Sequence, residues 1–271
     1  MISKYAEITT LTVCRSINAL LSTSRLWFTK EHFFAGKTSR FDFVYHSMKR
    51  WFSITAIFAT ALISAGGRVP DPDPTRFTKA MIAFEREDDA SPPVADLTLF
   101  TGSSSIRMWK TLAKDFPERE VLNRGFGGSH LSDVLHYFET LVPRHKPKVI
   151  VLYCGENDLW SGKPPKQVLE DFKTFADRVH EKFPKTRIHY LACKPSPKRW
   201  GKWDLYQRCN RMIANHCAKD KRLNFVDVSK VMLGKDGKPL PEIWLKDKLH
   251  MNEAGYARWT KLLRPILAKE K

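Results

Sequence analysis

An alternation of apolar runs with amphipathic stretches, which continues from residue 95 to the C-terminus, constrains the fold most. The strand-like apolar runs cover residues 95–102, 120–128, 148–155, 187–196 and 223–229. Helical patterns lie between and after them, over residues 106–116, 131–141, 165–183, 205–219 and 253–268. Strands that alternate with helices predict βαβ crossovers, and therefore a parallel sheet covered by helices on both faces. Ligands of such sheets bind at the carboxyl ends of the strands, so we expect functional residues in the loops there.

The first third of the chain has a different character. "MKRWFSITAIFATALISAGG" has a basic start, an apolar run and small residues, the layout of a secretory signal peptide. The apolar run is shorter than the roughly 18 residues of a membrane-spanning helix. A buried helix and a short membrane anchor are the alternatives. We predict an upstream extension over 1–47, a signal peptide over 48–67, a linker and N-terminal helix over 68–94, and the main domain over 95–271.

These bounds carry a prediction about localisation. With Met48 as the natural start, the protein would be exported to the periplasm or the cell exterior, and it would be membrane-anchored if the signal stayed uncleaved. We expect no stable membrane span.

Composition argues against several other functions. The formal net charge is +17, which is typical of proteins that bind nucleic acids or anionic surfaces. The basic residues are scattered, however, and no zinc-finger or helix-turn-helix motif is present, so we expect a solvated basic surface and no nucleic-acid partner. The five cysteines form no C-x-x-C pair. Cys154 and Cys193 lie in apolar runs and are expected to be buried.

One loop carries a candidate general base. Hydrolysis by a serine requires a base and a carboxylate that orients it. The pattern D-x-x-H occurs three times, but two copies lie inside the helices predicted over 131–141 and 165–183, where such pairs are commonplace. Only Asp247 and His250 lie in a loop, ahead of the last helix.

Three strand-end loops supply further polar groups. In "TGSSS", Ser103–Ser105 taken alone would be helix-capping residues. "NRGFGGSH" could cradle a phosphate, or it could point the Gly128 N–H at a developing oxyanion. Asn157 in "CGENDL" could bond its own loop or donate to the same oxyanion. Together with the Asp–His pair, these groups are what acyl transfer requires.

These four loops resemble the sequence blocks of the SGNH hydrolases, also called GDSL-type esterases and lipases. "GSSSIRMW" is similar to the first block, "NRGFGGS" to the second, "GEND" to the third and "DKLH" to the last, in the family's order. The resemblance covers Leu99 to Tyr256. It implies a three-layer α/β/α fold with a flavodoxin-like parallel sheet of about five strands.

The resemblance also implies roles for individual residues. Ser104 would be the nucleophile, His250 the general base and Asp247 its orienting partner. The oxyanion hole would comprise the N–H groups of Ser104 and Gly128 and the Asn157 amide. The implied activity is that of a secreted serine esterase, which needs neither a metal nor an organic cofactor.

The first block departs from the family at one position. The family's usual Asp between Gly and Ser is Ser103 here. A gapless overlay of the block places Ser104 at the nucleophile position and leaves Ser105 as the second candidate. We therefore expect one nucleophile, with one or both of the other serines serving as caps.

The substrate is less clearly indicated. The residues predicted to line the substrate site are Arg107, His130, Trp160 and Trp200, and further basic and aromatic residues near these loops are Lys198, Arg199 and Trp203. Aromatic rings stack on sugars and cations bind acidic groups, which favours a small-molecule or glycan ester, such as a short-chain or carbohydrate acetyl ester. Equally, the tryptophans could close the core and the cations could be solvated. The alternative function is a non-catalytic carbohydrate- or phosphate-binding module on the same fold.

Overall fold

The computed structural model describes residues 67–92, 94 and 96–270. The extension predicted for 1–47 and all but the last residue of the signal peptide predicted for 48–67 lie outside the described residues. None of the helices in the described part has the length and apolar character needed to cross a bilayer.

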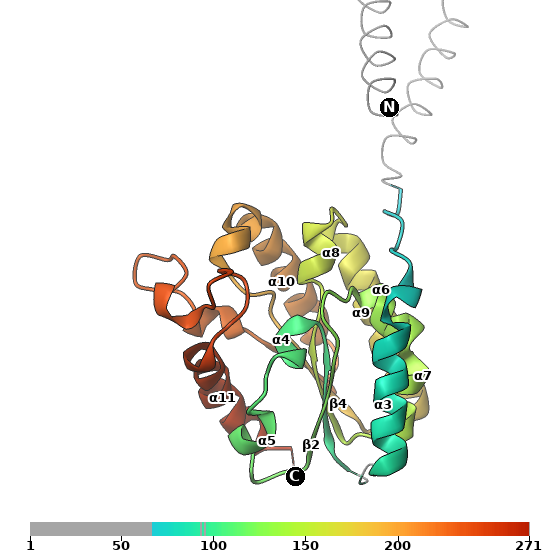
Figure 1. The fold of residues 1–271 in the computed structure, drawn as a ribbon. Helices are drawn as coiled ribbons and strands as arrows, with labels where there is room; N and C mark the ends of the chain where they lie inside the picture. The colour runs from blue at the N-terminus through green and yellow to red at the C-terminus, as the bar shows by residue number, and fades with distance from the viewer. Residues whose placement is uncertain (1–66, 93, 95, 271) are drawn as a thin grey trace, which may run out of the picture. The chain divides into compact units, whose positions relative to one another are not determined.

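A five-stranded parallel sheet forms the centre of the domain, as the alternating pattern predicted (Figure 1). The strands are β1 (Thr98–Gly102), β2 (Val121–Gly125), β3 (Val149–Tyr153), β4 (Arg187–Leu191) and β5 (Leu223–Val226). Their order in the sheet is β2-β1-β3-β4-β5. In the register, Gly102 pairs with Gly125 on one side and with Tyr153 on the other, so β1, β2 and β3 end at the same edge.

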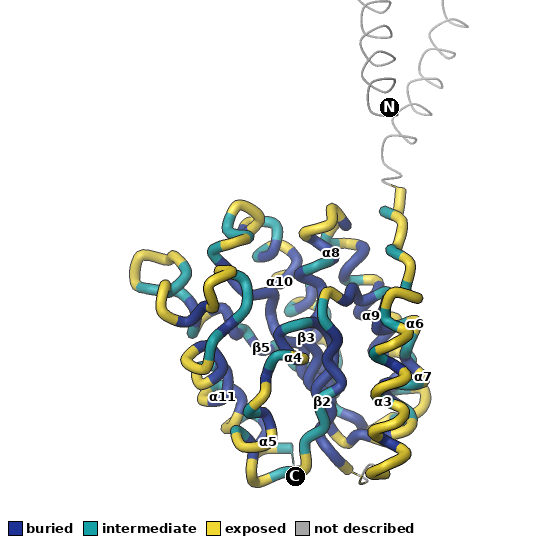
Figure 2. Tube along the Cα trace, viewed as in Figure 1, coloured by how far each residue is buried: buried dark blue, intermediate teal, exposed yellow. Residues whose placement is uncertain are grey.

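Helices cover both faces of this sheet, which makes three layers. The α-helices are α3 (Thr78–Ala90), α4 (Ser104–Arg107), α5 (Leu112–Asp115), α6 (Leu131–His136), α7 (Phe138–Leu141), α8 (Glu156–Trp160), α9 (Pro165–Lys182), α10 (Trp203–Cys217) and α11 (Glu253–Leu267). One apolar cluster joins the sheet to α3, α6, α7, α9 and α10, and a second joins it to α4, α5 and α11. Figure 2 shows the buried strands between these partly exposed helices.

Strand side chains alternate between the two clusters. In β3, Ile150 and Leu152 belong to the first cluster, whereas Val149, Val151 and Tyr153 belong to the second. This is the period of two that a strand imposes. Cys154 and Cys193 are buried, as expected from their apolar surroundings.

Two of the predicted helices are each interrupted. The pattern over 106–116 forms α4 and α5, and the pattern over 131–141 forms α6 and α7. In the first case Asp115 accepts hydrogen bonds from the Trp109 indole at 2.6 Å and the Thr111 hydroxyl at 2.7 Å. These bonds stabilise a turn that keeps Trp109 and Leu112 in the same core, whereas the periodicity predicted one continuous helix.

A buried histidine is expected to make the stability of this fold depend on pH. His145 is 1% exposed, and burial lowers its pKa to about 4, although Asp88 opposes the shift. The pKa in the unfolded chain is about 6.5, so the unfolded state binds the proton first as pH falls. The free energy of unfolding is therefore expected to decrease as pH falls from about 6.5 to about 4.

Measuring the free energy of unfolding in urea near neutral pH and at about pH 4.5 tests this expectation. The loss of stability should be smaller in His145→Gln than in the wild type. The matched control, His136→Gln, removes an exposed histidine and should retain the full loss. An equal loss in all three proteins would contradict the assignment.

Candidate active site

The turn that follows β1 places Ser104 at the carboxyl edge of the sheet. Gly102 has φ +116°, and a Cβ there would lie 2.1 Å from the Tyr153 carbonyl oxygen, so only glycine fits. The next N–H, of Ser103, donates to the same oxygen at 2.8 Å. Helix α4 then begins at Ser104. The chain thus turns sharply from the strand into a helix whose first residue is Ser104.

The three consecutive serines have different surroundings. Ser103 is the N-cap residue of α4, but its side chain makes no capping hydrogen bond, and Ser105 lies inside the helix. Ser103 therefore occupies the capping position without a side-chain capping bond, and Ser105 is not a cap. The Ser105 hydroxyl is buried without a hydrogen-bond partner among the described residues, whereas Ser104 is half-buried and its hydroxyl reaches a histidine.

That histidine is His250, from the loop that precedes α11. Its Nε2 lies 2.9 Å from Ser104 Oγ, and its Nδ1 lies 2.6 Å from Asp247 Oδ2. The other Asp247 oxygen accepts hydrogen bonds from the backbone N–H groups of Leu249 and His250. Burial alone would raise the pKa of Asp247, but these bonds outweigh it and lower the pKa to about 2. Asp247 is therefore ionised at neutral pH and can hold the imidazole in one orientation.

Three separate segments of the chain contribute groups that could donate hydrogen bonds. Asn157, in α8, donates one amide hydrogen to the Ser129 carbonyl at 3.0 Å, and its Oδ1 accepts from Arg199 at 3.0 Å. These two contacts define the orientation of the carboxamide and leave its second hydrogen free to donate. The Ser104 N–H opens α4 and has no acceptor within the helix. The loop after β2 contributes Gly128, in the left-handed region at φ +84°.

These groups line one cavity of about 370 Å³. Its lining residues are Ser104, Arg107, Gly127, Gly128, Asn157, Arg199, Leu249 and His250. Of the four residues predicted to line the substrate site, only Arg107 is among them. The Trp160 ring packs under the Arg199 guanidinium, Trp200 stacks on Trp203, and His130 is the N-cap residue of α6.

A larger groove lies elsewhere, at the β5 edge between α10 and α11. Its volume is about 910 Å³, and neither Ser104 nor His250 lines it. Within the described part of the chain, no three His, Cys, Asp or Glu side chains are grouped so as to hold a metal ion. The convergence of reactive groups therefore locates the candidate site in the smaller cavity.

A buried ionic cluster, which we did not predict from the sequence, supports Asn157 from one side. Glu156 is 3% exposed and pairs with Lys194 at 2.6 Å and with Arg199 at 3.1 Å. Burial would raise the pKa of Glu156, but the two cations outweigh it and keep the pKa below its ordinary value. The available signal was the placement of opposite charges at the ends of β3 and β4, which are neighbouring strands.

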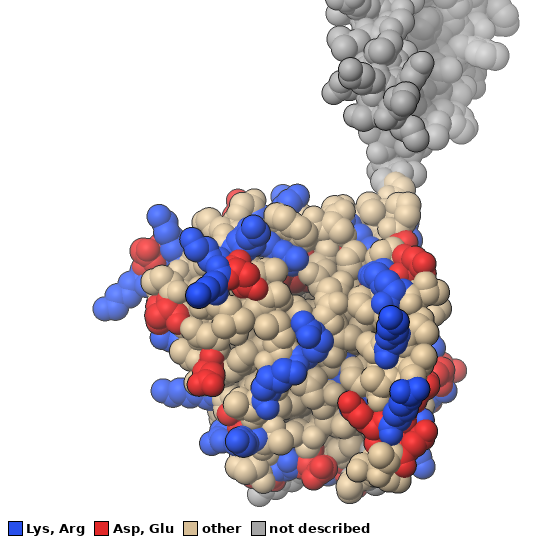
Figure 3. Space-filling view, in the orientation of Figure 1, with Lys and Arg blue, Asp and Glu red and all other residues tan. Residues whose placement is uncertain are grey.

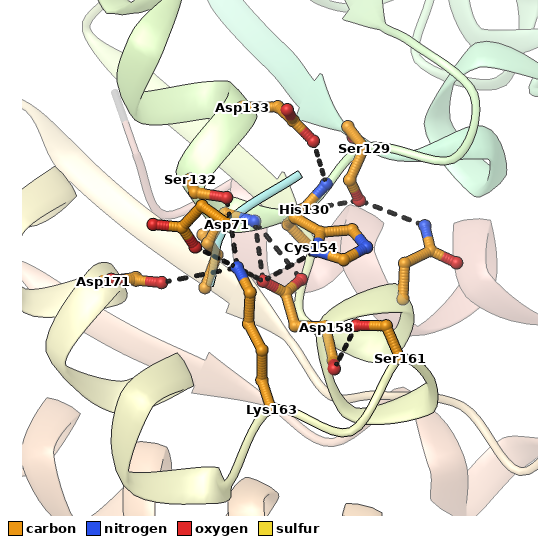
Figure 4. Close-up of polar contacts among 12 residues, drawn as sticks. Asp71, Ser129, His130, Ser132, Asp133, Cys154, Asp158, Ser161, Lys163 and Asp171 are labelled. Carbon is orange, nitrogen blue, oxygen red and sulfur yellow. Dashed lines mark hydrogen bonds and ion pairs between the residues drawn. The ribbon is translucent and has the colours of Figure 1, made fainter. Parts of the chain in front are cut away.

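A second buried ionic cluster is centred on Lys163 (Figure 4). Lys163 is 1% exposed and pairs with Asp158 at 3.0 Å and with Asp71 at 2.7 Å. Asp158 in turn accepts the Leu131 N–H at 3.2 Å. Asp71 belongs to the segment 67–73, which is also attached through Arg68 to Asp171 at 2.6 Å. The segment 67–73 therefore helps to neutralise Lys163, whose partner Asp158 is the neighbour of Asn157 in α8.

Comparison with solved structures shows the same fold. A Streptococcus pneumonia protein whose structure is named for platelet activating factor has a TM-score of 0.63 and 22% identity, over 70% of this chain and 92% of that one. A GDSL-like lipase from Bacteroides thetaiotaomicron has a TM-score of 0.61 and 20% identity, over 70% and 98%. A catalytic mutant of an acetylxylan esterase from Geobacillus stearothermophilus has a TM-score of 0.53 and 16% identity, over 63% and 94%.

The sequence itself matches a family model. A search of curated proteins finds no match. Residues 95–258, which span all four loops of the candidate site, match the model of the GDSL-like lipase/acylhydrolase family. The chain therefore belongs to the GDSL-like lipase/acylhydrolase family, a family of ester hydrolases.

Proposed function

We propose that this protein hydrolyses carboxylic esters through an acyl-serine intermediate, with Ser104 as the nucleophile. The observation that carries the proposal is the 2.9 Å contact between Ser104 Oγ and His250 Nε2, in a cavity that Gly128 and Asn157 also line. A hydroxyl is a weak nucleophile unless a base within hydrogen-bond reach accepts its proton.

The reaction follows from this arrangement. His250 takes the Ser104 proton as Oγ attacks the ester carbonyl, and Asp247 stabilises the imidazolium that forms. The Ser104 and Gly128 N–H groups and the Asn157 amide donate to the oxyanion. His250 then protonates the departing alcohol, which leaves the acyl group on Ser104. Water, deprotonated by His250, attacks this acyl-enzyme and releases the acid.

The proposed substrates are esters of short acids, including acetyl esters of carbohydrates. A cavity of about 370 Å³ lies near the lower end of the usual range for ligand sites and favours a small acyl group. One structural neighbour is named as an acetylxylan esterase, which is consistent with this size.

The test uses the full chain, p-nitrophenyl acetate and butyrate, and a fluorophosphonate probe that reacts only with activated serines. We expect hydrolysis with a preference for acetate, and a single labelled peptide that contains Ser104. If the wild type neither hydrolyses the esters nor reacts with the probe, the proposed esterase activity is refuted and a binding module is favoured.

Asn157→Ala tests the oxyanion hole. We expect kcat for p-nitrophenyl acetate to fall by about 10² to 10³, because one donor to the transition state is lost. Asn224→Ala removes a carboxamide outside the cavity and should leave kcat unchanged. Thermal melts identify any loss of folding. A change confined to KM would contradict the assigned role, because an oxyanion donor acts mainly in the transition state.

We also infer export, with 48–67 as a signal peptide and 95–271 as the catalytic domain. Cleavage near residues 66–69 would leave Asp71 in the mature chain, where it pairs with buried Lys163. N-terminal sequencing of protein recovered from the periplasm or the medium of an expressing bacterium tests this. Recovery of only uncleaved chain in the cytoplasm would contradict it.

A further inference from the structure

The candidate active-site cavity is lined by two guanidinium groups and by no carboxylate. Arg107 and Arg199 are among its eight lining residues, none of which is Asp or Glu. The Asp247 carboxylate is hydrogen-bonded to Nδ1 of the His250 ring, and Asp247 is not among the lining residues. A ligand in the cavity therefore meets more positive than negative charge.

The two arginines differ in how their charges are satisfied. Arg199 donates to both Glu156 and Asn157, so its guanidinium is already engaged in holding the oxyanion-hole amide. Arg107 is exposed, and within the described residues it has neither an ion pair within 4.0 Å nor a side-chain hydrogen bond. Its five N–H donors are therefore available to a ligand.

The Arg107 side chain packs against a neighbouring glycine. A Cβ on Gly127 would lie 2.7 Å from Arg107 Nε, so the side chain occupies the space that a larger residue would fill. Gly127 immediately precedes Gly128, the proposed backbone donor. The guanidinium thus lies along the glycine loop, on the wall of the cavity that contains Ser104.

From this arrangement we infer that the natural ester carries an anionic group, a carboxylate or a phosphate, which Arg107 binds beside the reacting carbonyl. This rests on the proposed esterase function and specifies its substrate class. A guanidinium offers paired donors that match the two oxygens of either anion. The partly enclosed cavity strengthens the interaction relative to open solvent.

The charge of the whole protein requires a control. The net charge of +17 attracts any anion, and basic side chains occupy several separate parts of the face shown in Figure 3. Arg211→Gln provides the control, because it removes an exposed arginine that lines the β5 groove and not the active-site cavity. All measurements are made at one ionic strength, since exposed charges are screened by salt.

The experiment compares kcat/KM within two substrate pairs. In the first pair, phenyl acetate is compared with 4-acetoxybenzoate, which carries a carboxylate in the leaving group. In the second pair, p-nitrophenyl butyrate is compared with mono-p-nitrophenyl glutarate, which carries a carboxylate in the acyl group. We expect the wild type to prefer the anionic member of one pair, and Arg107→Gln to reduce that preference by about 10- to 100-fold, the size of a charge-assisted hydrogen bond. Arg107→Lys should restore part of the preference, and Arg211→Gln should leave it unchanged.

Two results would overturn the inference. One is a wild type with no preference for the anionic member of either pair. The other is an equal loss of preference in Arg107→Gln and Arg211→Gln, which would assign the effect to net charge.

Labelling of Ser104 by the fluorophosphonate separates the two proposals. Labelling without any anion preference refutes the inference alone, whereas no labelling and no hydrolysis refute the esterase. If Ser104 is labelled but none of the four esters is cleaved, the inference is tested by whether an anion protects Ser104 from labelling. Inorganic phosphate should then slow labelling of the wild type more than that of Arg107→Gln, and equal slowing would overturn the inference.

Discussion

Replacing Ser104 with Ala is expected to lower kcat/KM for p-nitrophenyl acetate by about 10⁴ to 10⁶ and to abolish fluorophosphonate labelling. The variant loses the only atom that can form the acyl-enzyme in the proposed reaction. The fold should be unaffected, because Ser104 is half-buried and the turn before it depends on Gly102 and on the Ser103 N–H. Ester hydrolysis with purified protein, followed by a thermal melt, measures both.

Ser105→Ala is the matched control. It removes a hydroxyl one residue away that is buried without a partner among the described residues, so activity should be retained. Ser103→Ala should also be active, because its side chain makes no capping bond to α4. Loss of activity in Ser105→Ala, with activity retained in Ser104→Ala, would move the nucleophile to Ser105.

His250→Ala is expected to produce a loss of similar size, about 10⁴ to 10⁶ in kcat/KM. Without the imidazole, no described group is hydrogen-bonded to Ser104 Oγ to accept its proton. The Asp247 carboxylate would remain, but in the wild type it contacts Nδ1, the ring nitrogen farther from the serine, and it does not contact Ser104 itself. The measurement is the rate of p-nitrophenyl acetate hydrolysis near neutral pH.

Two comparisons make this result specific. His136→Ala, from another D-x-x-H pattern, should retain activity because His136 lies in α6 and does not line the cavity. The double variant Ser104→Ala/His250→Ala should be no less active than either single variant, since the two groups act as one unit. Additive losses would mean that Ser104 and His250 act independently.

The fold was predictable because its signals are local. Each strand is an apolar run, and each long helix has one apolar face, so α9, α10 and α11 begin and end within two residues of their predicted bounds. The interrupted helices were not predictable in this way. The break between α4 and α5 depends on Asp115 bonding Trp109 and Thr111, contacts that periodicity does not encode.

The candidate site was predictable in part. Polar residues after apolar runs identified three of the four loops, because parallel strands end at one edge of the sheet, and the D-x-x-H pattern ahead of the last helix identified the fourth. The lining of the cavity was not predictable, since Trp160 and Trp200 lie near these loops in sequence but pack against other side chains. The buried pairs Glu156–Lys194 and Asp158–Lys163 were also missed, because their burial depends on tertiary packing.

By itself, the sequence determined the layered parallel fold, the order of the four blocks and the residue types available at the strand ends. Only the tertiary structure decided which of three adjacent serines lies within hydrogen-bond reach of His250, and which of the two arginines in the cavity has no ion pair with another described residue. The physical reason is distance. Ser104 and His250 are 146 residues apart in the chain, and their 2.9 Å contact exists only because the folded chain brings the loop before α11 to the carboxyl end of β1.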